Sequence, residues 1–190
     1  MLKIMHRVNT IDTLKNTPED QGIELDLRDQ GERIIIRHDP FGEGELFEDW
    51  LEQYRHKTLI LNIKADGIEF RLRELMHRRG IENYFFLDSQ FPTIMRLIRE
   101  GETNIAVRFS EHEPAESALA LAGKVKWLWV DCFSRLPFEE DSYAALKKHF
   151  KMCIVSPELQ GHPVETISEY KRLLEKFPVE AVCTDFPELW

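Results

Sequence analysis

The sequence has few cysteines and no long apolar run, and both scarcities exclude whole classes of protein. Its cysteines, Cys132, Cys153 and Cys183, show no close C-x-x-C spacing. We therefore expect reduced core thiols and neither a disulfide framework nor a zinc site. No apolar stretch approaches the roughly 20 residues that a membrane-spanning helix needs. The opening segment, MLKIMHRVNT, lacks the apolar core of a secretion signal. These absences predict a soluble cytoplasmic protein.

Basic residues are also scarce relative to acidic ones. Lys and Arg number 25 against 34 Asp and Glu, so the formal net charge is −9. An acidic surface disfavours nucleic-acid and anionic-membrane partners. Hydrophobic residues make up 43% and charged residues 31% of the chain, which supports a sizeable core and excludes a disordered protein. Linkers and low-complexity tracts are missing, so residues 1–190 are predicted to form one domain.

Short apolar runs recur along the chain and alternate with amphipathic segments. LILNI, YFFL and WLWV are almost continuously apolar, which is typical of strands buried on both faces of a parallel sheet. The expected strands are Leu2–Met5, Gly22–Asp26, Leu59–Lys64, Tyr84–Asp88, Asn104–Phe109, Trp127–Cys132, Met152–Ser156 and Ala181–Asp185. This alternation predicts an α/β protein with a compact (β/α)8 TIM barrel. No Gly-rich phosphate fingerprint supports a Rossmann sheet.

Amphipathic segments at 46–55, 68–79, 91–100, 115–122, 141–150 and 164–177 predict the helices of this barrel. The first crossover allows at most a short helix before Pro18. Residues 22–40 predict a β-hairpin that turns at Asp29-Gln30-Gly31. Only FPELW follows the last strand, so we expect no eighth covering helix. The flank of the last and first strands, with Trp190, is then expected to expose apolar surface, which predicts a homodimer or another covering contact there.

Polar side chains follow the expected strands at their carboxyl ends, where barrels of this class carry their sites. Glu24 and Asp26 lie two apart on one strand, and Asn62 and Lys64 lie two apart on the next. Each pair therefore shares a face of its strand. Two inward carboxylates repel each other unless a cation or proton relieves them. Their oxygens suit Mg²⁺ or Ca²⁺ better than zinc.

Two histidines are expected near the same mouth. His6 ends the first strand, and the hairpin returns His38 to that end of the barrel. A pair of histidines beside a metal and basic groups suits general acid–base catalysis on a phosphate ester. The alternative is a structural ion network, in which the two carboxylates pair with Arg7, Arg28 or Lys64.

Four segments in order, HRVNT (6–10), GIELDLRDQGERIIIRHDP (22–40), LILNIK (59–64) and CTDFPE (183–188), resemble the glycerophosphodiester phosphodiesterase family. The resemblance implies a (β/α)8 barrel that cleaves small-molecule phosphodiesters with a divalent metal, Mg²⁺ or Ca²⁺. It also implies a role for each matching residue. The acid–base pair would be His6 and His38, the phosphate-binding residues Arg7 and Lys64, and the metal ligands Glu24 and Asp26, with Asn62 at the third ligand position.

The chain departs from the family pattern at three places. Val8 stands where the family has glycine, which narrows the approach of the backbone to a ligand. Asn62 stands where the family has a glutamate, so the metal site loses one negative charge. The asparagine oxygen can still coordinate a hard cation, but metal affinity is expected to fall unless Asp131 or Glu158 supplies the missing carboxylate. The family's capping insertion after His38 is missing, which predicts an open mouth that also admits sugar- or lipid-linked phosphodiesters.

Two further residues are candidates at the mouth. Asp39 is expected to orient a histidine or to anchor the hairpin. Arg108 is either a second phosphate contact or the ion-pair partner of Glu24 or Asp131. The expected function is a metal-dependent phosphodiester hydrolase of lipid metabolism. The alternative is a catalytically weakened or inactive barrel that binds a phosphorylated ligand or a protein partner.

Overall fold

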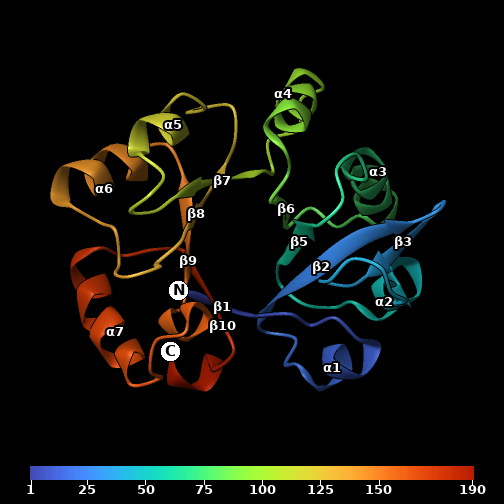
Figure 1. Ribbon diagram of the computed structural model, residues 1–190, viewed down its shortest axis with the longest axis horizontal. Coiled ribbons are helices and arrows are strands. Elements are labelled where there is room, and N and C mark those ends of the chain that lie inside the picture. The colour runs from blue at the N-terminus through green and yellow to red at the C-terminus, as the bar shows by residue number, and fades with distance from the viewer. The chain divides into compact units, whose positions relative to one another are not determined.

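The computed structural model describes residues 1–190 and alternates strands with helices along most of the chain (Figure 1). The strands are β1 (Leu2–Met5), β2 (Gly22–Gln30), β3 (Arg33–Ile36), β4 (Glu45–Leu46), β5 (Leu59–Ile63), β6 (Tyr84–Leu87), β7 (Ala106–Phe109), β8 (Trp127–Val130), β9 (Lys151–Val155) and β10 (Ala181–Thr184). The helices are α1 (Ile11–Asn16), α2 (Phe47–Gln53), α3 (Glu69–Arg79), α4 (Phe91–Arg99), α5 (Ala115–Leu119), α6 (Glu140–Lys147) and α7 (Thr166–Lys176). Every predicted strand and helix is present, with ends shifted by a few residues.

The chain divides into two compact units. The amino-terminal unit is Met5–Glu102, and the carboxyl-terminal unit combines Met1–Ile4 with Thr103–Trp190. The single domain over 1–190 stays a prediction.

The sheet of the amino-terminal unit has the strand order β4-β3-β2-β5-β6. β2 pairs in parallel with β5, and β5 pairs in parallel with β6, as the continuous apolar runs predicted. All side chains of β5 and β6 are buried. Helix α2 lies against β3 and β4 and buries Phe47 and Trp50 there. The β2–β5 register places Asp26 opposite Asn62, so these two residues lie side by side, in the middle of β2 and near the carboxyl end of β5.

The predicted hairpin is present as β2 and β3, but its turn lies further along the chain than expected. Gln30 still pairs with Arg33 in the ladder, so Gly31 and Glu32 form the turn. Gly31 has a φ of 63°, which glycine adopts without steric cost. A short strand that the sequence pattern missed, β4, pairs antiparallel with β3. Two residues are too few for an alternation of apolar and polar side chains to be recognised.

The carboxyl-terminal unit contains a parallel sheet in the order β10-β9-β8-β7. The cysteines are all buried and free, as predicted. The last strand was predicted to expose apolar surface, and this prediction is wrong, because all four residues of β10 are buried. After β10 the chain forms a short 3₁₀ turn, Pro187–Leu189, and the indole Nε1 of Trp190 donates to Ser156 Oγ at 2.9 Å. The last strand therefore exposes no apolar face, and the homodimer stays a prediction without this support.

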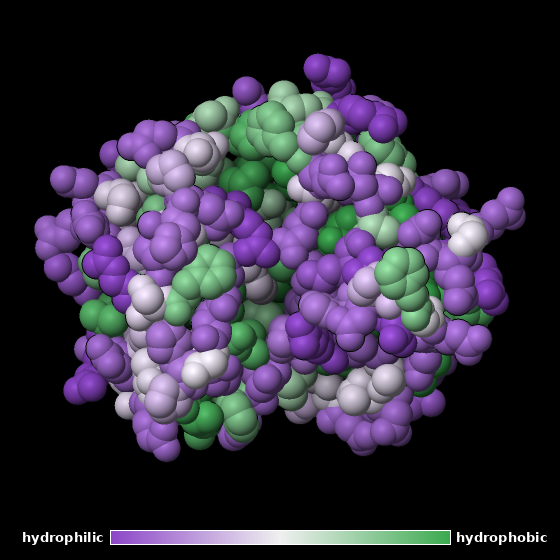
Figure 2. Space-filling view, viewed as in Figure 1, coloured by the Kyte–Doolittle hydropathy of each residue, from purple (hydrophilic) through white to green (hydrophobic).

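The face in Figure 2 is mostly hydrophilic, with small hydrophobic areas between polar side chains. Phe41 and Phe91 are the most exposed large hydrophobic residues, with relative exposures of 102% and 63%. No helix has the length and apolar character needed to cross a membrane.

Candidate active site

Two buried carboxylates on β2 form the centre of the candidate site. Glu24 is 1% exposed and Asp26 is fully buried. They lie on one face of the strand because side chains alternate along it. Burial, and then the charge of Asp26, raise the pKa of Glu24. The charge of His6 and hydrogen bonds from the Arg7 N–H and from Asn62 act in the opposite direction. An ionised pair in this position favours a cation nearby.

Glu24 is held from two sides. The backbone N–H of Arg7 donates to Glu24 Oε2 at 2.7 Å, and Asn62 Nδ2 donates to Glu24 Oε1 at 2.8 Å. The first contact depends on the left-handed backbone of Arg7, which has a φ of 52°. Val8 follows with its side chain buried and its N–H on the Glu24 carbonyl oxygen at 2.9 Å. The backbone N–H groups of Arg7 and Val8 thus both bind Glu24, and Arg7 is the residue with the left-handed conformation.

Asp26 gathers the two cations that were predicted to hold a phosphate. Arg7 Nε lies 3.8 Å from Asp26 Oδ2, and Lys64 Nζ lies 3.6 Å from Asp26 Oδ1. Lys64 Nζ also donates to Asp88 Oδ2 at 3.1 Å. The side chain of Arg7 is 50% exposed and that of Lys64 17% exposed. Both cations therefore combine a fixed carboxylate partner with access to solvent, which suits the capture of an anion.

Asn9, the fourth residue of the HRVNT segment, is a site residue to which the sequence pattern gave no role. Its amide clasps Asp26 twice: Asn9 Nδ2 donates to Asp26 Oδ2 at 2.8 Å, and the Asp26 N–H donates to Asn9 Oδ1 at 3.0 Å. The clasp fixes the carboxylate's orientation. The one sign of this role in the sequence is the Asn9-Thr10 pair at the end of HRVNT.

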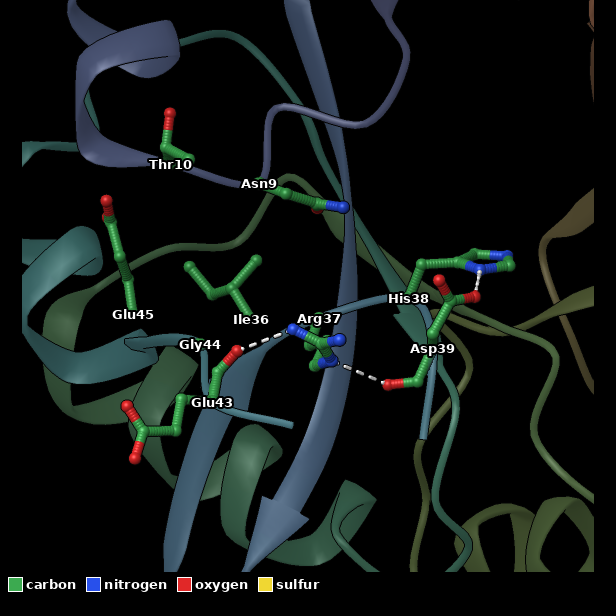
Figure 3. A pocket seen from close by; sticks show the side chains of 9 residues that line it. All are labelled: Asn9, Thr10, Ile36, Arg37, His38, Asp39, Glu43, Gly44 and Glu45. Carbon is green, nitrogen blue, oxygen red and sulfur yellow. Dashed lines mark hydrogen bonds and ion pairs between the residues drawn. The ribbon is translucent and has the colours of Figure 1, made fainter. Parts of the chain in front are cut away.

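His38 lies on the loop after β3, beside an open pocket of about 590 Å³ (Figure 3). Its Nδ1 lies 2.9 Å from Asp39 Oδ1. A carboxylate only accepts, so Nδ1 carries the proton and Nε2 is the nitrogen left to accept one. The hydrogen bond from His38 is the main cause that lowers the pKa of Asp39. Asp39 thus orients the histidine, which is one of the two roles predicted for it.

The loop that carries His38 is braced by Arg37. Its Nε donates to the Asp39 carbonyl oxygen at 3.0 Å and its Nη1 to the Glu43 carbonyl oxygen at 2.8 Å, as Figure 3 shows. Gly42 makes room for this guanidinium, because a Cβ at that position would lie 2.3 Å from Arg37 Cζ. The pocket walls carry Asp39, Glu43 and Glu45, so the loop combines a rigid backbone with an acidic lining.

His6 belongs to the same unit, at the end of β1. The structure connects it to the carboxylates electrostatically, because its charge lowers the pKa of Glu24. The amino-terminal unit therefore holds all seven residues that the family resemblance singled out. The sequence also allowed a structural ion network of the two carboxylates with Arg7, Arg28 or Lys64. Of these three residues, Arg7 and Lys64 do pair with Asp26. The third, Arg28, binds main-chain oxygens.

The remaining candidates lie in the carboxyl-terminal unit, and each carboxylate there is engaged. Asp131 Oδ2 pairs with Arg108 Nη1, and Asp131 Oδ1 accepts from Trp129 Nε1 at 3.3 Å and from Gln160 Nε2 at 3.2 Å. Of the two roles considered for Arg108, the ion pair with Asp131 is the one observed.

Glu158 is engaged in the same way. Its Oε1 accepts from Thr184 Oγ1 at 2.5 Å and from the Asp185 N–H at 3.1 Å, and its Oε2 accepts from Ser156 Oγ. Both oxygens of Asp131 and both oxygens of Glu158 therefore already accept hydrogen bonds or form an ion pair, so neither side chain is available as the missing metal ligand.

Asp26 on β2 and Asn62 on β5 fit a hard cation through oxygens that have no hydrogen bond. Asp26 Oδ1 and Asn62 Oδ1 are buried atoms without a hydrogen-bond partner, and the nearest cation to the first is Lys64 Nζ in an ion pair at 3.6 Å. Burying such acceptors costs free energy unless a donor or a cation satisfies them. No group of three or more His, Cys, Asp or Glu side chains is arranged to hold a metal. Any metal site here therefore depends on the amide of Asn62 beside Glu24 and Asp26.

Comparison with known proteins agrees with the fold. No protein-family model and no curated protein match the sequence. A glycerophosphodiester phosphodiesterase from Agrobacterium tumefaciens str. C58 superimposes with a TM-score of 0.67 at 13% identity, over 99% of this chain and 96% of that one. A glycerophosphoryl diester phosphodiesterase from Parabacteroides distasonis ATCC 8503 gives a TM-score of 0.69 at 13% identity, over 99% and 84%. The chain has the fold of these proteins, and the predicted barrel class is confirmed.

Proposed function

We propose that the protein is a phosphodiester hydrolase of the glycerophosphodiester type. The observation that carries this proposal is the arrangement around Asp26, where two solvent-accessible cations, Arg7 and Lys64, lie against one fully buried carboxylate. The acid–base candidates His6 and His38 belong to the same unit. Structures with the same fold carry the name of this activity, which supports the reaction class.

The residues divide the chemistry between them. Arg7 and Lys64 hold the phosphate oxygens, Arg7 with its fork of donors and Lys64 as a point charge. One histidine takes the proton of the attacking hydroxyl, and the other gives a proton to the leaving oxygen. A substrate hydroxyl next to the phosphate attacks phosphorus while the ester bond to the leaving alcohol breaks. The product is a cyclic phosphate, which water then opens with the two histidines in exchanged roles.

A divalent ion, Mg²⁺ or Ca²⁺, belongs to this proposal as a cofactor. Glu24, Asp26 and Asn62 would hold it through their oxygens, two of which are buried without a hydrogen bond. Such an ion supplies charge stabilisation for the phosphate oxygens. Because Asn62 replaces a charged ligand of the family pattern, we expect weaker metal binding than a site with three carboxylates gives.

A second candidate function rests on the contact between Asn62 and Glu24. The Asn62 amide donates to Glu24 Oε1 at 2.8 Å, so a neutral donor satisfies a carboxylate oxygen that a third acidic residue would repel. A site relieved in this way suits a barrel that binds a phosphorylated ligand or protein without cleaving it. Asn62→Glu discriminates: a gain in metal affinity and turnover supports a weakened enzyme.

Cellular context completes the proposal. The net charge of −9 and the three buried free thiols fit a cytoplasmic enzyme of lipid metabolism that acts on small phosphodiesters and has no nucleic-acid partner. A homodimer is also proposed, and sedimentation of the purified protein tests it.

The proposal is tested with a panel of phosphodiesters that includes glycerol-, sugar- and lipid-linked ones. Each is incubated with the purified protein in Mg²⁺, in Ca²⁺ and in chelator, and the released alcohol is measured. We expect release from at least one substrate, with less in chelator. Binding of phosphorylated compounds without any release would support the second candidate instead.

A further inference from the structure

Arg28 connects the two catalytic segments of the proposed site through their backbones. Its guanidinium donates from Nε at 3.0 Å and from Nη2 at 2.8 Å to the carbonyl oxygen of His38. Its Nη1 donates at 2.7 Å to the carbonyl oxygen of Lys64. One side chain thus joins the loop after β3 to the end of β5.

Both carbonyls belong to residues just beyond the last residue of a strand. β3 ends at Ile36 and β5 at Ile63. The Lys64 N–H still bonds the Leu27 carbonyl oxygen at 2.9 Å, but the His38 ring has only the exposed Asp39 carboxylate as its side-chain partner. The Arg37 N–H bonds the Asp26 carbonyl oxygen at 2.9 Å, and Arg28 then binds the carbonyl oxygen of His38 itself, the residue from which the imidazole projects.

We propose that Arg28 is a positioning residue that sets the separation between the His38 imidazole and the Lys64 ammonium. This inference rests on the proposed function, in which the first group transfers a proton and the second holds the phosphate. A planar guanidinium with three donors in fixed directions holds two carbonyl oxygens at a defined spacing. A lysine ammonium at position 28 carries the same charge but cannot reproduce that fork.

Arg28 also shares a face of β2 with Glu24 and Asp26, because residues two apart along a strand point the same way. The same strand therefore supplies the carboxylates and, one step further, the clamp that spaces the groups around them. Three charge-assisted hydrogen bonds to main-chain oxygens are stronger than neutral ones, which suits a contact that resists small displacements.

The test compares Arg28→Lys and Arg28→Ala with Arg33→Lys. Arg33 is an exposed arginine of the same hairpin, and its Nη2 donates only to Gln30 Oε1 at 2.9 Å. With a hydrolysed phosphodiester, we expect kcat of both Arg28 variants to fall about 10- to 100-fold, since a misplacement of about 1 Å has effects of that order. KM should change less than about three-fold. Added guanidinium ion should restore part of the activity of Arg28→Ala.

A purely structural arginine gives a different result. If kcat per folded molecule is unchanged while the melting temperature falls, or if guanidinium ion restores nothing, the positioning role is wrong. The Arg33→Lys control should keep both constants, since its side chain reaches neither carbonyl.

A second readout separates this inference from the proposed function. If the wild-type protein cleaves no phosphodiester, the proposed function fails while the clamp can still be measured through inorganic phosphate. Phosphate binding is followed by NMR on the His38 imidazole signals. We expect the phosphate Kd to rise about two- to three-fold in Arg28→Lys, in line with the small change in KM, and to stay constant in Arg33→Lys. An equal Kd in wild type and Arg28→Lys would overturn the inference.

Discussion

Both units contain carboxylates with little exposure to solvent, but the hydrogen bonding of these carboxylates differs. In the carboxyl-terminal unit, both oxygens of Asp131 and both oxygens of Glu158 accept from side chains or main chain of that unit. In the amino-terminal unit, Asp26 Oδ1 accepts no hydrogen bond and lies 3.6 Å from Lys64 Nζ, and both cations beside Asp26 are partly exposed. Complete compensation stabilises a fold, whereas incomplete compensation leaves a place for a ligand from solution.

Among the carboxylates of the two units, the largest effect on activity should follow from Asp26→Asn. This change removes the charge that holds Arg7 and Lys64 together, so we expect phosphodiester hydrolysis to fall on the order of 10²- to 10³-fold. The melting temperature should change little, because the asparagine keeps the shape and relieves Glu24 of a like charge. Initial rates and thermal melts measure both. Asp29→Asn, at an exposed position of the same strand, is the matched control.

The opposite pattern is expected for Asp131→Asn. Arg108 loses its charged partner, so the free energy of unfolding should fall by about 2 kcal/mol. Activity per folded molecule should stay at the wild-type level. All three cysteines belong to this unit and are buried, and burial raises the pKa of Cys132. A thiol reagent therefore reports its opening, and labelling should be faster in Asp131→Asn than in Asp26→Asn. Equal labelling rates would remove the distinction between the groups.

A smaller effect is expected at the loop that carries His38. In Gly42→Ala, the new Cβ meets the Arg37 guanidinium, which is the end of a flexible side chain and moves away. The loop loses its brace, and we expect kcat to fall about 10-fold with little change in KM. Arg37→Ala should have a similar effect. The double variant should be no worse than either single one, because both remove the same brace. Additive losses would contradict this explanation.

The smallest effect should come from Asp39→Asn. The His38–Asp39 contact is exposed, so stability should not change measurably near neutral pH. The lowered pKa of Asp39 gives a stabilisation that is present above its unfolded pKa and is lost as the pH falls through its folded pKa. Any difference in melting temperature, however small, should therefore be present near neutral pH and disappear in acid. At neutral pH we expect kcat to fall about three-fold, because the asparagine no longer fixes the Nδ1 proton.

The part of this site that follows from sequence is the part set by local periodicity. Alternation along β2 places Glu24 and Asp26 on one face, and continuous apolar runs such as β5 identify buried parallel strands. Contacts that depend on register and on backbone conformation are different. The left-handed turn at Arg7, the direction of the Asn62 amide and the reach of Arg28 to two carbonyl oxygens are fixed only after the strands pair.

The central claim, that the amino-terminal unit cleaves phosphodiesters with His6 and His38, is tested most directly by their substitution. Hydrolysis by His6→Ala and His38→Ala is compared with that of His77→Ala, an exposed histidine on α3. We expect each of the first two changes to lower kcat at least about 100-fold, as the loss of a general acid or base does, and the third to leave it unchanged. Folded His6→Ala and His38→Ala variants that retain full activity would contradict the claim.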